Sequence, residues 1–126
     1  MCGIIGYTGA SPALSMVIDS LRKLEYRGYD SAGIALTGKA GEKLIVAKRA
    51  GKLSNLESAL TSDHADSLSG IGHTRWATHG GPTDENAHPH ISSDGKVAVI
   101  HNGIIENYLE LKAELETRGH KFSSQT

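Results

Sequence analysis

The chain has little of what marks several classes of protein. It has a single cysteine among its 126 residues, which excludes an internal disulfide and fits a reducing compartment. Its 13 Lys and Arg residues nearly balance its 14 Asp and Glu residues, and no basic run is present, so nucleic acid is not an expected partner. No apolar run approaches the roughly 18 residues of a membrane span, and the N-terminal region lacks the basic start of a targeting signal. The sequence therefore predicts a cytoplasmic protein that does not enter a membrane, and its length predicts one domain.

Hydrophobic periodicity and turn residues predict alternating strands and helices. We expect strands over 2–7, 32–38, 42–50, 70–77 and 96–102, and helices over 11–28, 54–60 and 108–119. Ser11 is expected to cap the first helix, and Ser54 and Glu57 have the spacing of a capping box. The turn residues at 38–41 predict a β-hairpin. Residues 120–126 begin like another strand and then stop, which predicts that the sequence is a fragment of a longer domain.

Cys2, directly behind the initiator methionine, is the first candidate for chemistry. A lone cysteine in an arbitrary protein is more often a small buried side chain than a reactive one. Removal of Met1, which is normal when the next side chain is small, gives Cys2 both a thiol and a free α-amine. An α-amine with a reference pKa of roughly 7.7 to 8.0 can act as a base for a thiol with a reference pKa of about 8.5. Cys2 therefore offers a nucleophile and its base in one residue.

Asn102 and Gly103, which follow an apolar stretch, are the second candidate. An Asn-Gly pair most often marks a turn. At the end of a strand, however, the Asn102 side-chain amide and the Gly103 backbone N–H are able to point at one oxygen. Such donors hold the oxyanion of a tetrahedral intermediate, each contributing a factor of about 10² to 10³ in rate. Both interpretations stay open from the sequence alone.

Two arginines next to glycines are the third candidate. Arg75 lies at a predicted transition from strand to loop, which suits bidentate binding of a carboxylate, although a surface charge is the ordinary alternative. Trp76, the only tryptophan, is expected either in the core or on a loop that acts as a lid. Arg27 and Gly28 end the first predicted helix. They are either a helix C-terminus with a favourable cation or a guanidinium placed beside the thiolate.

The seven histidines raise the alternative of a zinc site. His79, His88 and His90 lie close together in the sequence, and Cys2 is a possible further ligand. The His-Pro-His run, however, matches none of the well-spaced Cys and His patterns of zinc sites, and a second cysteine is missing. We therefore predict neither a metal nor another cofactor.

Four separate stretches together resemble one enzyme family. They are CGIIGYTG, LRKLEYRGYDSAGIA, GHTRWATHGGPTDENAHPH and VIHNGIIEN. These stretches are similar to the N-terminal glutaminase domain of the class II glutamine amidotransferases, which are N-terminal-nucleophile hydrolases. Among these enzymes they most resemble the members that aminate fructose 6-phosphate. The four stretches are specific and extend over nearly the whole chain.

The resemblance implies the α+β fold of these hydrolases, a four-layer αββα sandwich with antiparallel sheets. Residues 1–126 would be a partial glutaminase domain that contains the N-terminal half of this sandwich. The implied reaction is hydrolysis of L-glutamine to glutamate and ammonia. The ammonia would aminate fructose 6-phosphate in sugar-isomerase domains that this sequence lacks, in a full-length protein that is expected to be a homodimer.

The resemblance also assigns roles to individual residues. Cys2 corresponds to the nucleophile, with its α-amine as the general base. Asn102 and Gly103 resemble the oxyanion hole, and Arg27 and Gly28 match positions that organise the nucleophile. The glutamine-binding segment, whose loop closes over the substrate, corresponds to Arg75, Trp76, Thr78 and His79. Family glutaminase domains are considerably longer and carry an aspartate soon after position 126 that binds the α-amino group of the substrate. The alternative is therefore a non-catalytic fragment that only binds glutamine or pairs with a missing segment.

Overall fold

The structure is a computed structural model that describes residues 1–40 and 42–126. Its strands are β1 (Gly3–Thr8), β2 (Ser31–Leu36), β3 (Ile45–Ala50), β4 (Ser69–Arg75), β5 (His90–Ile91) and β6 (Ala98–Val99). Its helices are α1 (Ala13–Leu24), α2 (Leu53–Glu57) and α3 (Tyr108–Thr117), with short 3-10 helices η1 (Glu25–Arg27) and η2 (Ser62–His64). Gly41, in the expected hairpin turn at 38–41, lies outside the described residues. Within the described ranges, no helix has the length and apolar character that crossing a membrane requires.

Four strands form one antiparallel sheet in the order β1-β4-β2-β3. β2 and β3 pair as the predicted hairpin, with Ser31 opposite Ala50. β4 lies between β1 and β2, and its register places Thr74 opposite Gly3 and Arg75 opposite Ser31. As a result, the start of β1, the start of β2 and the end of β4 lie together at one end of the strands.

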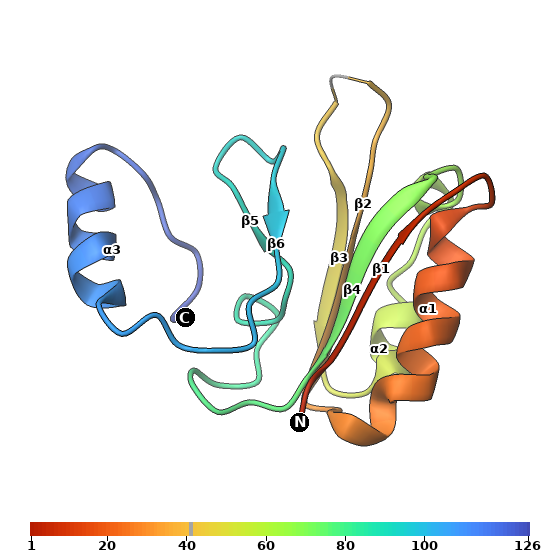
Figure 1. Ribbon diagram of the computed structural model, residues 1–126, viewed down its shortest axis with the longest axis horizontal. Helices are drawn as coiled ribbons and strands as arrows, with labels where there is room; N and C mark the ends of the chain where they lie inside the picture. The colour runs from red at the N-terminus through yellow and green to blue at the C-terminus, as the bar shows by residue number, and fades with distance from the viewer. Residues whose placement is uncertain (41) are drawn as a thin grey trace.

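The hydrophobic core lies between this sheet and the two helices that cover one of its faces, α1 and α2 (Figure 1). Every residue of β2 is buried, because neighbouring strands and both adjoining layers cover this central strand. Full burial of a valine, leucine or isoleucine side chain stabilises a fold by about 1.5–3 kcal/mol. The core residues are Ala13, Val17, Ile18, Leu21, Ala32, Ile34, Leu36, Ala47, Leu53 and Leu56.

The other face of the sheet meets a second, smaller layer of strands (Figure 1). β5 and β6 form an antiparallel pair in this layer, and α3 lies beyond them. The layers therefore follow the order helix, strand, strand, helix. This order confirms the predicted αββα fold, with the second sheet and its helix layer represented here by two short strands and α3 alone.

The helices differ in detail from the sequence-based expectation. α1 begins at Ala13, with Pro12 rather than Ser11 as the N-cap residue. α2 begins at Leu53, so Ser54 is inside the helix and the capping box predicted with Glu57 is wrong. Capping-box hydrogen bonds occur instead at η2, between Thr61 and His64.

The later strands are shorter than predicted. β6 covers two residues of the expected range 96–102, because its antiparallel partner β5 is itself two residues long. β5 was not expected, since two residues are too few to give an alternating pattern. The strand expected at 120–126 does not form in the described structure. The backbone N–H of Gln125 instead donates to the side-chain oxygen of Asn86 (2.8 Å).

A stack of three histidines joins the two layers of strands. His73 on β4, His88 just before β5 and His90 on β5 have successive ring centroids 4.5 Å apart. Burial lowers the pKa of His73 to about 4 and that of His88 to about 3, and it also lowers the pKa of His90. Repulsion within the stack and from the Arg75 guanidinium contributes to these lowered pKa values of His73 and His88. The three rings are therefore neutral in the folded protein near pH 7.

We expect the free energy of unfolding to fall as the pH drops from 7 to 5. The unfolded chain takes up protons on these histidines below about pH 6.5, whereas the folded chain holds them neutral, so protons favour unfolding. Each unit of pKa difference corresponds to about 1.4 kcal/mol once the pH has fallen below both values. Urea denaturation at several pH values measures the slope. His73→Phe should flatten it, and the exposed control His120→Gln should not. Equal slopes in all three proteins would contradict the prediction.

Candidate active site

Cys2 lies at the end of the sheet where β1 begins and β4 ends. Its Sγ accepts a hydrogen bond from the backbone N–H of Trp76 (3.2 Å) and lies 3.7 Å from the carbonyl oxygen of the same residue. The side chain is half-buried, so the sulfur keeps access to solvent. The Trp76 N–H dipole points at the atom that carries the negative charge of a thiolate. The β1–β4 register therefore places a free thiol against an aligned backbone donor.

The connection between η1 and β2 holds the backbone that faces this thiol. A Cβ atom on Gly28 would lie 2.8 Å from the Arg75 carbonyl carbon and 2.9 Å from the Trp76 nitrogen, so only glycine allows this approach. Asp30 adds two hydrogen bonds. Its N–H donates to the Arg75 carbonyl oxygen (3.0 Å), and its Oδ2 accepts from the Ala77 N–H (2.8 Å). The sequence predicted a role for Gly28 but not for Asp30. An acidic residue directly before a strand is common, so the position of Asp30 gave no local signal of its role.

We expect Gly28→Ala to lower the free energy of unfolding by roughly 1–3 kcal/mol, the usual cost of overpacking. The added methyl group would push against backbone atoms, which cannot rotate away as a side chain can. Gly28 has an extended φ of −175°, so the expected loss is steric rather than conformational. Gly6→Ala in β1 is the matched control, because its nearest atom, Ile71 Cγ2, would lie 3.9 Å from the new Cβ. Urea denaturation that gave equal losses for both variants would refute this account of Gly28.

Arg27 lies at the N-terminus of the chain. Its Nη2 is 3.6 Å from the Sδ of Met1, and its buried Nε has no hydrogen-bond partner among the described residues. The guanidinium therefore borders the first residue of the chain. The interpretation that this positive charge lies beside the thiolate stays a prediction.

The buried guanidinium of Arg75 is turned toward its own loop. Nη1 donates to the carbonyl oxygen of Gly81 (3.0 Å), and Nη2 donates to those of His79 and Gly80. These bonds fold the segment after β4 around the arginine. In this conformation both outer nitrogens of Arg75 donate to backbone oxygens of its own loop.

The other residues of the predicted binding segment lie on the same loop. The Trp76 ring is 46% exposed and packs edge-to-face on Tyr29, with ring centroids 5.7 Å apart. Of the two interpretations of Trp76, the structure therefore favours the loop position over the core. Thr78 is exposed. The His79 ring packs edge-to-face on Tyr108 at 5.4 Å, and its buried Nε2 has no partner among the described residues.

Asn102 and Gly103 are exposed on the segment that follows β6. Figure 1 places this segment at the same end of the molecule as the N-terminus. The backbone just before it is anchored, because the His101 carbonyl oxygen lies 3.1 Å from Nε2 of His88. The structure thus joins Cys2, Gly28, Arg75 and Trp76 through direct contacts, whereas Asn102 and Gly103 lie outside that contact network.

The four residues considered for zinc do not come together around one point. His88 and His90 belong to the histidine stack, His79 packs on Tyr108, and Cys2 contacts Trp76. In residues 1–40 and 42–126, no group of three His, Cys, Asp or Glu side chains is arranged to hold a metal ion.

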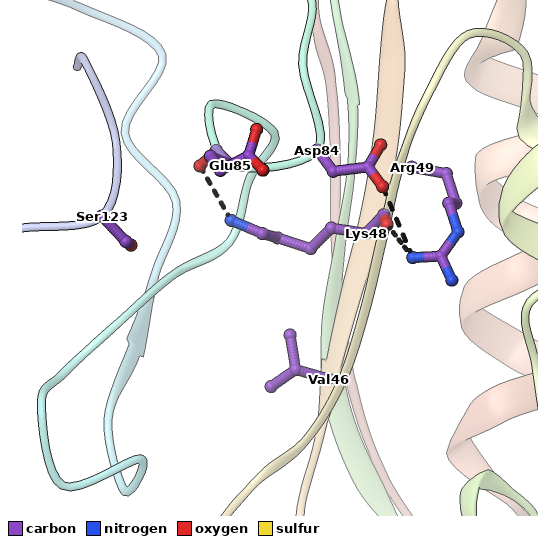
Figure 2. A pocket seen from close by; sticks show the side chains of 6 residues that line it. All are labelled: Val46, Lys48, Arg49, Asp84, Glu85 and Ser123. Atoms are coloured by element: carbon purple, nitrogen blue, oxygen red, sulfur yellow. Dashed lines mark hydrogen bonds and ion pairs between the residues drawn. The ribbon is translucent and has the colours of Figure 1, made fainter.

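A hollow beside β3 lies on the strand farthest from β1 and therefore away from Cys2 (Figure 2). Lys48 Nζ donates there to the carbonyl oxygens of Glu85 (3.1 Å) and Ala87 (2.8 Å), and burial lowers its pKa. Arg49 donates to the Lys48 carbonyl oxygen (2.7 Å) and lies 3.6 Å from the Asp84 carboxylate. These charged groups are bound to backbone oxygens or to one another. The hollow is therefore a place where β3 and the loop before β5 are held together, rather than a set of free charges for a ligand.

Comparison with known proteins finds relatives that match this chain over its whole length. The chain is 60% identical over 126 residues to the glutamine–fructose-6-phosphate aminotransferases of Thermus thermophilus and Aquifex aeolicus. It is 59% identical over 128 residues to that of Streptomyces coelicolor. These matches cover 100% of this chain and 20% or 21% of the relatives, so the chain spans about a fifth of their length.

Solved structures show the same fold. The glutamine phosphoribosylpyrophosphate amidotransferase from B. subtilis aligns with a TM-score of 0.77 and 30% identity, over 100% of this chain and 27% of that one. A structure described as the allosteric regulatory enzyme of purine biosynthesis aligns with a TM-score of 0.75 and 31% identity, over 97% of this chain and 26% of its own. A model of the glutamine amidotransferase domain matches residues 45–126. The chain therefore belongs to the glutamine amidotransferase domain family, as its sequence resemblance predicted.

Proposed function

We propose that residues 1–126 are part of the glutaminase domain of a cytoplasmic glucosamine-6-phosphate synthase. In this proposal L-glutamine is hydrolysed to glutamate and ammonia, and the ammonia aminates fructose 6-phosphate bound elsewhere in a homodimeric protein. The names of the 60% identical relatives support both substrates. The observation that carries the glutaminase part is the placement of Cys2 Sγ 3.2 Å from the Trp76 N–H, at the start of the chain and beside the glutamine-binding segment.

The proposed reaction starts after Met1 has been removed. The α-amine of Cys2 takes the thiol proton, and the sulfur attacks the side-chain amide carbon of glutamine. The amide oxygen becomes an oxyanion, which the Asn102 side-chain amide and the Gly103 N–H stabilise. The protonated amine then gives its proton to the departing nitrogen, and ammonia leaves a γ-glutamyl thioester. Water, activated by the same amine, hydrolyses the thioester to glutamate and free Cys2.

The remaining residues bind or position. Arg75, Thr78 and His79 bind the glutamine main-chain groups in this proposal, and Trp76 covers them with its loop. The exposure of Trp76 and the position of all four residues at the end of β4 and on the loop directly after it support this arrangement. Arg27 and Gly28 keep the N-terminal residue and the Trp76 backbone in place, which their contacts with Met1 and with the β4 end support.

Labelling with 6-diazo-5-oxo-norleucine, a reactive glutamine analogue, tests the proposal. The folded chain that begins at Cys2 should gain one adduct on Cys2, formed by loss of dinitrogen as sulfur bonds to the analogue carbon. Peptide mass spectrometry locates the adduct, L-glutamine should slow its formation, and Cys2→Ala should stay unlabelled. An unlabelled folded chain with a free N-terminal Cys2 would instead favour a non-catalytic fragment, which only binds glutamine or pairs with a missing segment.

A further inference from the structure

His88 connects the histidine stack to the segment that carries Asn102. Its Nε2 lies 3.1 Å from the carbonyl oxygen of His101, the residue directly before Asn102. A carbonyl oxygen only accepts hydrogen bonds, so Nε2 of His88 must carry the proton and donate it. This bond links residues that are 13 positions apart and lie on either side of the β5–β6 pair.

The surroundings of His88 favour one protonation state. Its ring is 8% exposed and lies 4.5 Å from the rings of both His73 and His90, measured between centroids. Arg75 from β4 and Lys48 from β3 are the charged side chains whose repulsion lowers pKa values in the stack, and both are cationic. A neutral imidazole has one N–H, and the buried Nδ1 of His88 has no partner in the described structure. The single proton therefore belongs on Nε2, directed at His101.

The backbone around His88 rests on the four-stranded sheet. A Cβ atom on Gly33 of β2 would lie 2.1 Å from the His88 carbonyl oxygen, so the two backbones touch. β2 is the fully buried central strand. The backbone of His88 therefore packs against a fully buried strand, while its ring reaches toward an exposed segment.

We propose that His88 is a positioning residue for the oxyanion hole. By donating to the His101 carbonyl, it fixes the backbone from which the Asn102 amide and the Gly103 N–H extend. It thereby ties these donors, which lie outside the Cys2 contact network, to the buried part of the first sheet. This inference rests on the proposed glutaminase function and adds to it the group that holds the oxyanion donors in place.

Kinetics of two substitutions test the role of the donated proton. His88→Phe keeps a flat ring but removes the donor, and His88→Gln keeps an N–H donor. A donor group displaced by about 1 Å costs about 10²-fold in rate. We expect His88→Phe to lower kcat for glutamine hydrolysis by about 10- to 100-fold with little change in KM. His88→Gln should recover part of this loss, and the exposed control His120→Phe should match the wild type. Wild-type kcat in folded His88→Phe would overturn the proposal.

A spectroscopic measurement covers the case in which His88→Phe does not fold. In the ¹⁵N-labelled wild-type chain, His88 should show the Nε2–H tautomer at pH 7, with slow exchange of that proton with water. The Nδ1–H tautomer, or a rapidly exchanging ring proton, would contradict the hydrogen bond to His101 and refute the inference. This readout does not depend on turnover.

The labelling experiment separates the two proposals. If the wild type is not labelled at Cys2 by 6-diazo-5-oxo-norleucine, the glutaminase function fails, and the oxyanion role of His88 fails with it. If the wild type is labelled but His88→Phe hydrolyses glutamine normally, the function stands and only the positioning role is lost. Slow hydrolysis by His88→Phe together with Nε2–H on His88 supports both.

Discussion

A chain that keeps Met1 is expected to hydrolyse glutamine about 10²- to 10⁴-fold more slowly than the same chain beginning at Cys2, the usual contribution of a general base. With Met1 attached, the Cys2 nitrogen is an amide and no longer takes a proton. The free amine then lies one residue upstream, about 3.8 Å away by Cα spacing, whereas a base must lie within roughly 2.6 to 3.2 Å of the proton's donor atom. Met1 is 77% exposed and contacts Arg27, so its removal opens no hydrophobic core.

Two preparations of the chain test this expectation. One is released from a cleavable fusion so that it starts at Cys2, and the other retains Met1, with both N-termini verified by mass spectrometry. A small disulfide reagent should react with the Cys2 thiol in both preparations, which shows that the sulfur is present and accessible in each. Equal turnover of glutamine in both preparations would rule out the amine as the base.

Asn102→Ala is expected to slow glutamine hydrolysis by about 10²- to 10³-fold, or roughly 2.7–4 kcal/mol of barrier, as loss of one oxyanion donor usually does. The side-chain amide acts on the charge that forms in the transition state, so kcat should fall while KM changes little. Because Asn102 is exposed, its removal leaves no cavity in the core. Steady-state measurement of glutamate release gives both constants.

Asn107→Ala is the matched control for this substitution. Asn107 lies five residues further along the same exposed stretch and makes no side-chain capping bond to α3. It should therefore keep wild-type kcat. If Asn102→Ala behaved like Asn107→Ala, Asn102 would be a turn residue and the oxyanion would need another donor.

The sequence predicted those parts of the site whose signals are local. Cys2 stood out by its position behind Met1, and Gly28 by its place after a helix. Asp30 was missed because its role depends on which backbone lies opposite it, and that is set by the pairing of β2 with β4. Long-range pairing of this kind is not encoded in residue spacing.

The fold class followed from motifs, but the contacts between layers did not. His88 and His90 are two residues apart, so their contact is local in the sequence. His73 joins them only because β4 runs through the middle of the sheet and presents that ring to the second layer. The sequence also predicted a functional guanidinium at Arg75 but not its bonds to three loop carbonyls, because residue spacing does not show how the loop turns these oxygens toward the arginine.

The strand order has a consequence for synthesis of the protein on the ribosome. In the described structure β1 is an edge strand whose neighbour is β4, so Thr8 pairs with Ser69 and Gly3 with Thr74. The first residues to emerge therefore have no strand to pair with until β4 has also left the exit tunnel. Until then the sheet does not cover the N-terminus, so we expect the removal of Met1 that the proposed reaction requires to precede the enclosure of Cys2 by the fold.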